Sequence, residues 1–187
     1  MRTLSLTELL ASLQAQNKIK CTSTVPPRLS GLSKSCKTFY FDLGARTISV
    51  YLSKERVFNP DGSEVGGAYY HENKFLWATL SRGKQRARQT LSHELAHVMQ
   101  DAVNGWPPEQ EGSLSCEEQI RLYEKYYYHF DDDYASKNPV EAAAEVFRVL
   151  LGFREAYELW AHNPELLVDY GNYWHNVIKK LTPPVFK

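Results

Sequence analysis

Residues 84–103 read KQRARQTLSHELAHVMQDAV, and the pattern predicts that they form one helix. Asn104-Gly105 supplies a C-terminal stop directly after them, and Pro107-Pro108 prevents the helix from continuing. Residues 93–97, within this helix, read HELAH and match the pattern HExxH. We therefore expect a mixed part of the chain before this helix and a helical part from it onward.

The two histidines of this pattern are spaced to bind one metal ion. His93 and His97 are four positions apart, so on a helix they differ by about 40° in rotation and one turn in rise. Both imidazoles can then reach one ion at about 2.0–2.1 Å, the usual Zn–N distance. Glu94 lies about 60° from His97, close enough to contact a water on the metal without being a ligand. The spacing predicts that the two histidines share one metal ion and that Glu94 lies beside a water on it.

The helix also carries an apolar stripe. Four residues fall within an arc of about 60° opposite the two histidines: Leu91, Leu95, Val98 and Ala102. We expect this side of the helix to lie in the core, so that the other side presents the histidines.

A catalytic zinc usually has three protein ligands and an open fourth position, so a third ligand is needed. The pattern HExxHxxGxxH requires Gly and His where this chain has Gln100 and Val103, which excludes the metzincin arrangement. The main candidate is Glu141, in residues 138–145, NPVEAAAE. Asn138 and Pro139 there predict the start of a helix that runs to about residue 160.

The sequence leaves alternatives for Glu141. Asn138 and Glu141 also match a capping box, in which the Glu141 carboxylate would bond to the Asn138 N–H. Glu141 and Glu145 are like charges four residues apart, which destabilises a bare helix by roughly 0.2–0.5 kcal/mol. A cation would remove that penalty, and so would Arg148, three residues after Glu145. The other candidate ligands are Glu145, His129, Asp131, Asp132 and Asp133.

The remaining segments predict an α+β fold. Before residue 84 we expect a helix over about 5–17, a loop over 21–37, a hairpin formed by 39–43 and 48–52, a turn at 59–62, and a second hairpin from 68–70 to 75–80. After residue 103 we expect helices over about 115–130, 139–160 and 164–181. These elements predict a single domain over 1–187. A short antiparallel sheet within about 1–83 packs on the helix at 84–103, and the part over about 84–187 is mostly helical.

Composition limits the partners. The 187 residues contain 22 Lys+Arg and 22 Asp+Glu, and this zero net charge at pH 7 does not favour nucleic acid as a partner. The mean hydropathy is −0.47, and no apolar run approaches the roughly 18 residues of a membrane span. Cys21, Cys36 and Cys116 are an odd number at wide spacing, which favours free thiols. With no convincing signal peptide at the N-terminus, we expect a cytoplasmic protein.

Two segments together carry a resemblance to a known class of enzymes. Residues 88–97, RQTLSHELAH, are preceded by a predicted hairpin and followed by residues 138–151, NPVEAAAEVFRVLL. This arrangement resembles the gluzincin-type zincin metallopeptidases, and among small proteins the minigluzincins and the ImmA/IrrE-type family. Those proteins pair an RxTLxHELxH-like helix with an ExxAxxF-like helix, whose Ala and Phe would be Ala144 and Phe147. The resemblance covers roughly residues 65–152.

The resemblance implies a zinc-dependent metallopeptidase with a zincin-like fold. It implies zinc on His93 and His97, the third ligand at Glu141, and general-base work for Glu94 on a zinc-bound water. The substrate would be a protein or peptide, cleaved by endopeptidase rather than exopeptidase action. In zincins a strand before the active helix commonly holds an extended substrate by strand addition, and residues 75–80 are the corresponding edge.

The sequence is also compatible with two other functions. A zincin-fold regulatory or interaction protein with narrow or lost activity would bind zinc without cleaving a partner. ImmA/IrrE-type proteins are often linked to transcriptional switches, but the sequence has no recognisable helix-turn-helix module, which argues against direct DNA binding. A zinc hydrolase of a non-peptide substrate would be separated by screening amides and esters. The sequence gives neither the substrate nor the oligomeric state.

Overall fold

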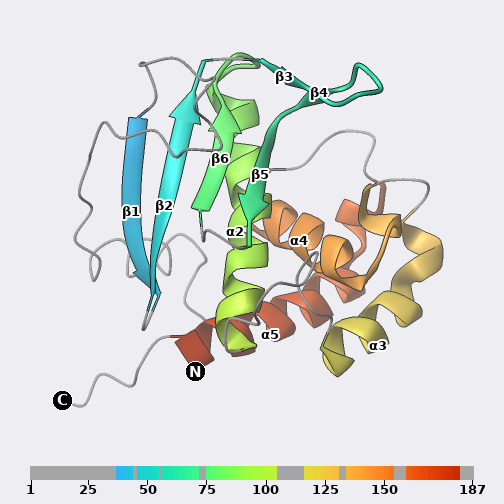
Figure 1. Cartoon of the computed structure of the whole chain (residues 1–187). Helices are drawn as coiled ribbons and strands as arrows, with labels where there is room; N and C mark the ends of the chain where they lie inside the picture. The colour runs from blue at the N-terminus through green and yellow to red at the C-terminus, as the bar shows by residue number, and fades with distance from the viewer. Residues whose placement is uncertain are drawn as a thin grey trace. The chain divides into compact units, whose positions relative to one another are not determined.

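The computed structural model describes residues 37–43, 46–54, 56–71, 75–104, 116–130, 134–153 and 159–181. Within these residues the strands come first and the helices follow (Figure 1), which confirms the α+β class. The helix predicted over 5–17 lies outside the described residues. None of the described helices is long and apolar enough to cross a membrane.

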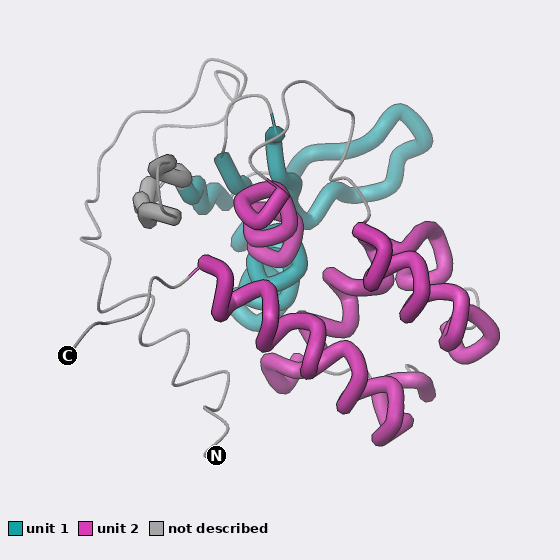
Figure 2. The backbone as a smooth tube through the Cα atoms, turned by 90° about the horizontal axis from the view of Figure 1, so that it is seen from below, with its two compact units in different colours: residues 1–94 teal, residues 95–187 magenta. Residues whose placement is uncertain are grey.

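The chain divides into two compact units, Met1–Glu94 and Leu95–Lys187, coloured teal and magenta in Figure 2. The boundary falls inside helix α2 (Lys84–Val103), which therefore contributes its first half to unit 1 and its second half to unit 2. The expected organisation as one domain stays a prediction.

The main sheet of unit 1 has the strand order β1-β2-β6-β5. Strand β1 (Lys37–Leu43) pairs with β2 (Arg46–Ser53), and β5 (Gly67–Tyr70) pairs with β6 (Phe75–Thr79), both antiparallel, which confirms the two predicted hairpins. The expectation of a wholly antiparallel sheet is wrong, because β2 and β6 pair in parallel. A parallel pair needs a long crossover, which the chain between β2 and β6 supplies.

Strand β6 lies inside the sheet, which corrects the expected substrate edge. It is hydrogen-bonded to β2 on one side and β5 on the other, so residues 75–79 offer no free strand edge. All five of its residues are buried. Among the described strands, the edges of this sheet are β1 and β5.

The β6 sequence FLWAT forms the core of unit 1 because it is apolar on both faces, as expected for a central strand. Phe75 and Trp77 pack with Tyr51 of β2, and the rings of Tyr51 and Phe75 meet edge to face at 5.4 Å. The indole N–H of Trp77 donates to the Ser53 hydroxyl at 3.1 Å, so its one polar atom is satisfied in the buried position.

The predicted turn at residues 59–62 is present, and it joins two short strands that the sequence did not reveal. They are β3 (Val57–Phe58) and β4 (Glu64–Val65). Gly62 adopts a φ of 82°, and the Asp61 carboxylate accepts from the Ser63 backbone N–H at 2.8 Å. Strands of two residues are too short to show the alternating pattern that identifies a strand.

The helices of the second half follow their predicted positions closely, with one exception. Helix α2 and helix α5 (Pro164–Leu181) have the predicted bounds. Helix α3 (Glu117–Tyr126) ends in a 3₁₀ turn, η2 (Tyr127–His129), so it is slightly shorter than expected. A second 3₁₀ turn, η3 (Tyr134–Ser136), precedes helix α4.

Helix α4 (Pro139–Leu150) is the exception, because it ends well before residue 160. Gly152 adopts a φ of 89°, and the N–H of Phe153 returns to the Arg148 carbonyl at 3.2 Å. This is the left-handed glycine stop of a helix C-terminus. Residues near 160 belong instead to a separate 3₁₀ turn, η4 (Leu159–His162).

Helix α4 forms the core of unit 2. Ala142, Ala143 and Ala144 are fully buried, and their small side chains let other segments approach the helix closely. Trp174 of α5 uses this space, because its indole N–H donates to the Ala143 carbonyl at 2.9 Å and its ring lies 4.6 Å from the Phe147 ring. Helix α4, whose first turn carries Glu141, is therefore packed against α5.

Two glycine-to-alanine substitutions are expected to change stability in opposite directions. A Cβ on Gly67 would lie 2.4 Å from the Trp77 carbonyl oxygen and 2.6 Å from the Thr90 side chain. We expect Gly67→Ala to lower the free energy of unfolding by about 2 kcal/mol. A Cβ on Gly171, in α5, meets nothing within 4 Å, so Gly171→Ala is expected to raise it by up to about 1 kcal/mol. Urea unfolding checks both, and destabilisation by Gly171→Ala equal to that by Gly67→Ala would contradict the packing described.

Candidate metal centre

The two histidines of the HExxH pattern lie on a buried side of α2. His93 and His97 are each 7% exposed. The predicted apolar stripe is only partly buried: Val98 is inaccessible, whereas Leu91 and Leu95 are half-buried. The expectation that the histidines face away from the buried side of the helix is therefore wrong. Their surroundings exclude most water, which strengthens electrostatic interactions around them.

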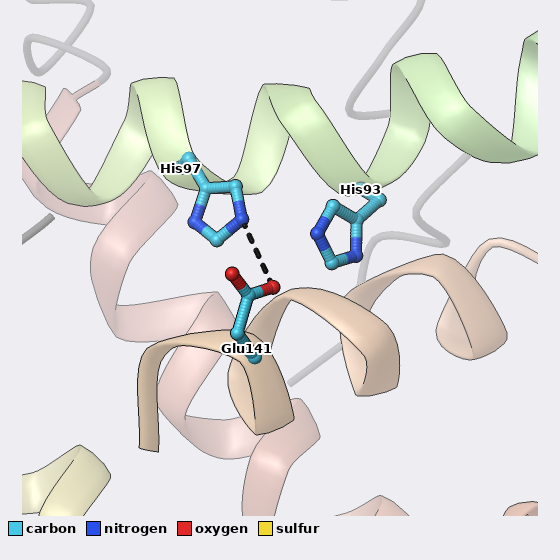
Figure 3. Close-up of side chains that lie close together, drawn as sticks. All are labelled: His93, His97 and Glu141. Atoms are coloured by element: carbon cyan, nitrogen blue, oxygen red, sulfur yellow. Dashed lines mark ion pairs between the residues drawn. The ribbon is translucent and has the colours of Figure 1, made fainter. Parts of the chain in front are cut away.

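Glu141 is placed by the start of α4. The Asn138 side chain accepts from the backbone N–H groups of Val140 and Glu141 at 3.0 and 2.9 Å, and Pro139 occupies the first helical position. The predicted helix start is thus confirmed. The cap fixes the backbone of Glu141 in the first turn, and the carboxylate itself extends toward the histidines (Figure 3).

The His97–Glu141 pair lies wholly within unit 2. Its Nε2 and Oε2 atoms are 3.4 Å apart, with the two side chains 9% and 19% exposed. Two ligand atoms bound to one tetrahedral ion at 2.0–2.1 Å lie about 3.3 Å from each other. The separation in the pair is therefore close to that of two ligands sharing one zinc ion.

His93 completes the group through the helix itself. It precedes His97 by one turn of the continuous helix α2, so its position relative to His97 is fixed by helix geometry. One ligand atom from each of His93, His97 and Glu141 can be chosen so that all three lie within 4.8 Å of one another (Figure 3). The three predicted ligands thus come together as a group that could hold a metal ion.

Glu145, the nearest alternative ligand, is committed to another interaction. Its carboxylate accepts from the Arg148 Nε at 3.0 Å and also from Nη2, and both side chains are nearly inaccessible. Arg148 also donates through Nη1 to the Phe153 carbonyl at 2.6 Å. The two carboxylates of α4 therefore have different partners. Glu145 is paired with Arg148 on its own helix, and Glu141 faces His97.

Of the other alternative ligands, only His129 lies within the described residues, and it is not part of the group. His129 is exposed on η2, and its ring lies 6.1 Å from the ring of Tyr126. Asp131, Asp132 and Asp133 lie outside the described residues. Among the described residues, the candidate metal group contains only His93, His97 and Glu141.

Glu94 follows His93 on α2 and is half-buried. It is not a member of the metal group, and its role as general base stays a prediction. The residue is partly exposed, and a general base that acts on water must be reachable by water.

Gln100 is the residue at this centre that the sequence did not identify. Its side-chain oxygen lies 3.2 Å from His97 Nδ1, and its side-chain nitrogen donates toward the Val140 carbonyl at 3.5 Å. In the sequence, Gln100 stands where the pattern HExxHxxGxxH requires Gly, and this mismatch alone gave it no role at the site. The available signal was its spacing, because a residue three positions after a histidine lies beside it on a helix.

Removing Arg148 tests whether Glu145 has a structural role. Arg148→Met would leave the Glu145 carboxylate buried without its guanidinium partner, so we expect unfolding to cost about 3 kcal/mol less. The double variant Glu145→Met/Arg148→Met should recover more than half of this loss, because no charge then remains buried at the pair. Urea unfolding with a chelator present measures both, and an Arg148→Met protein as stable as the wild type would show that the pair does not matter.

Comparison with protein-family models, with curated proteins and with solved structures found no match to this chain. The likeness to the zincin class therefore stays a prediction based on the residues quoted above.

Proposed function

We propose that this protein is a zinc-dependent metallopeptidase. The observation that carries the proposal is the convergence of His93, His97 and Glu141, whose ligand atoms can lie within 4.8 Å of one another, directly beside Glu94. An HExxH pattern on a helix is typical of metallopeptidases that use its Glu as general base. All four of these residues come from two helices, α2 and α4.

The donor set fits zinc better than magnesium or calcium. Two imidazole nitrogens and one carboxylate oxygen are ligands that zinc accepts, whereas magnesium and calcium favour oxygen alone. Three protein ligands leave a fourth position open, which is the arrangement of catalytic rather than structural zinc. The 3.4 Å between His97 Nε2 and Glu141 Oε2 supports the same ion, since zinc ligands lie about that far apart.

Zinc bound by these residues would lower the pKa of water toward neutrality and polarise a peptide carbonyl. The residues of the chain supply the other functions. His93, His97 and Glu141 hold and orient the ion, and the burial of the two histidines limits competing water. The Glu94 carboxylate accepts a proton from the attacking water and then donates it to the leaving amine nitrogen. We propose endopeptidase action on a protein or peptide.

The proposal also includes the cellular compartment and the kind of partner. Cys116 carries a free thiol, which suits a reducing compartment, and we propose that the protein works in the cytoplasm. The balance of 22 basic and 22 acidic residues gives no long-range attraction for nucleic acid, so a peptide is the favoured partner.

Glu94→Gln is expected to abolish hydrolysis while keeping the metal. The substitution removes the base but no ligand, so cleavage of a fluorogenic peptide library should fall by about 10²–10⁴-fold. Zinc content by elemental analysis should stay near one per chain. The matched control is Glu124→Gln, which makes the same change at an exposed position of α3 and should leave both readouts unchanged.

The outcomes of this experiment separate the candidate functions. A fully active Glu94→Gln enzyme would contradict the proposed mechanism. A wild-type protein that holds zinc but cleaves neither peptides nor any candidate partner would favour a regulatory protein. Turnover of esters or non-peptide amides alone would favour a different hydrolase.

A second pair of variants tests the third ligand. Glu141→Gln replaces a carboxylate ligand with a weakly coordinating amide, so the dissociation constant for zinc should rise by more than about 100-fold, the upper range for residues outside the ligand set. Glu145→Gln makes the same change one turn further along α4 and should alter zinc affinity by less than about threefold. Competition with a chromophoric chelator measures both, and the reverse ranking would assign the ligand to Glu145.

A further inference from the structure

A neutral imidazole binds a metal only through the ring nitrogen that carries no proton. Each neutral histidine has one N–H donor and one nitrogen with a lone pair, and the hydrogen bond made by one nitrogen decides which role the other takes. For His97 to bind a metal beside Glu141 through Nε2, its proton must reside on Nδ1. The structure contains a side chain suited to hold it there.

The Gln100 amide can take only one orientation that satisfies its neighbours. Its side-chain nitrogen faces the Val140 carbonyl oxygen at 3.5 Å, and a carbonyl oxygen only accepts hydrogen bonds. The NH₂ group therefore belongs on that side, and the amide oxygen faces His97 Nδ1 at 3.2 Å. Because an amide oxygen cannot donate, the hydrogen bond between them requires the proton to be on Nδ1.

We propose that Gln100 is a positioning residue that holds His97 with its proton on Nδ1 and so directs the Nε2 lone pair toward the metal site shared with Glu141. This inference rests on the proposed zinc site. Gln100 is 2% exposed, so water does not readily take over its hydrogen bonds. Val140 precedes Glu141 in the first turn of α4, so one amide connects the ring to the turn that carries the carboxylate ligand.

The choice of variant follows from the surroundings of Gln100. It lines a small pocket together with Val103, Cys116 and Tyr173. Gln100→Ala would enlarge this pocket and admit water, which could replace the lost amide oxygen. Gln100→Met keeps the length of the side chain and removes the strong acceptor, so it tests the hydrogen bond rather than the space.

Two further variants complete the set. Gln100→Glu keeps an acceptor for Nδ1–H, in the carboxylate–histidine–metal arrangement, and should restore what Gln100→Met loses. Gln119→Met is the matched control. Gln119 is also buried in unit 2, and its amide oxygen accepts from the Cys116 backbone N–H at 2.8 Å. This control should lower stability without altering His97.

The experiment has two readouts on the full chain. Two-bond ¹H–¹⁵N correlation spectra of the metal-free protein with labelled histidine, at a pH where the ring is neutral, identify the tautomer of His97. Chelator competition gives the dissociation constant for zinc. We expect an Nδ1–H tautomer in the wild type and in Gln100→Glu, a mixed or Nε2–H tautomer in Gln100→Met, and a zinc affinity 10- to 100-fold weaker in Gln100→Met.

The results also separate this inference from the proposed function. An Nε2–H tautomer in the wild type overturns the inference by itself, even if Gln100→Met does not fold. An unchanged tautomer in a folded Gln100→Met protein, or a zinc affinity within twofold of the wild type, overturns it as well. A wild-type protein that binds no zinc overturns the proposed function, and the spectra then show separately whether Gln100 sets the tautomer.

Discussion

The approach of His97 to Glu141 is the interaction on which the candidate site depends. Their Nε2 and Oε2 atoms are 3.4 Å apart in a largely buried position. Removing a carboxylate from water costs free energy unless charges or hydrogen bonds compensate for its lost hydration. Asn138 fixes the turn that carries Glu141, and Gln100 connects the His97 ring to the same turn. The position is thus constrained from both helices, as a site must be if it is to hold an ion at about 2 Å.

Helix α4 gives two carboxylates on one helix different environments. Glu145 lies one turn after Glu141 and is paired with Arg148, which also holds the Phe153 carbonyl at the end of the helix. Glu141 is directed instead to the histidine of α2. The overall charge of the chain is balanced, so the charges that matter for the proposed chemistry are local ones. This separation makes Glu145 part of the helix structure and leaves Glu141 for the metal group.

Much of this arrangement follows from local signals in the sequence. The bounds of α2 and the start of α4 depend on caps and stop residues within a few positions, and HExxH spacing identifies His93 and His97. Features that depend on tertiary packing could not be predicted from local sequence signals. The parallel pairing of β2 with β6 depends on how two hairpins meet, and the hydrogen bonds of Gln100 depend on a carbonyl forty residues away. The early end of α4 did have a local signal, the glycine at 152, but the apolar pattern around it favoured a longer helix.

The most direct test of the central claim is an anomalous difference map, at the zinc absorption edge, from crystals of the protein grown with one equivalent of zinc. If zinc binds as proposed, the map shows one strong peak about 2.0–2.1 Å from His97 Nε2, from a ring nitrogen of His93 and from a carboxylate oxygen of Glu141. Glu94 should lie beside the peak without coordinating it. A peak coordinated by Glu145 or His129, or the lack of any peak between His93, His97 and Glu141, would contradict the proposed metal site.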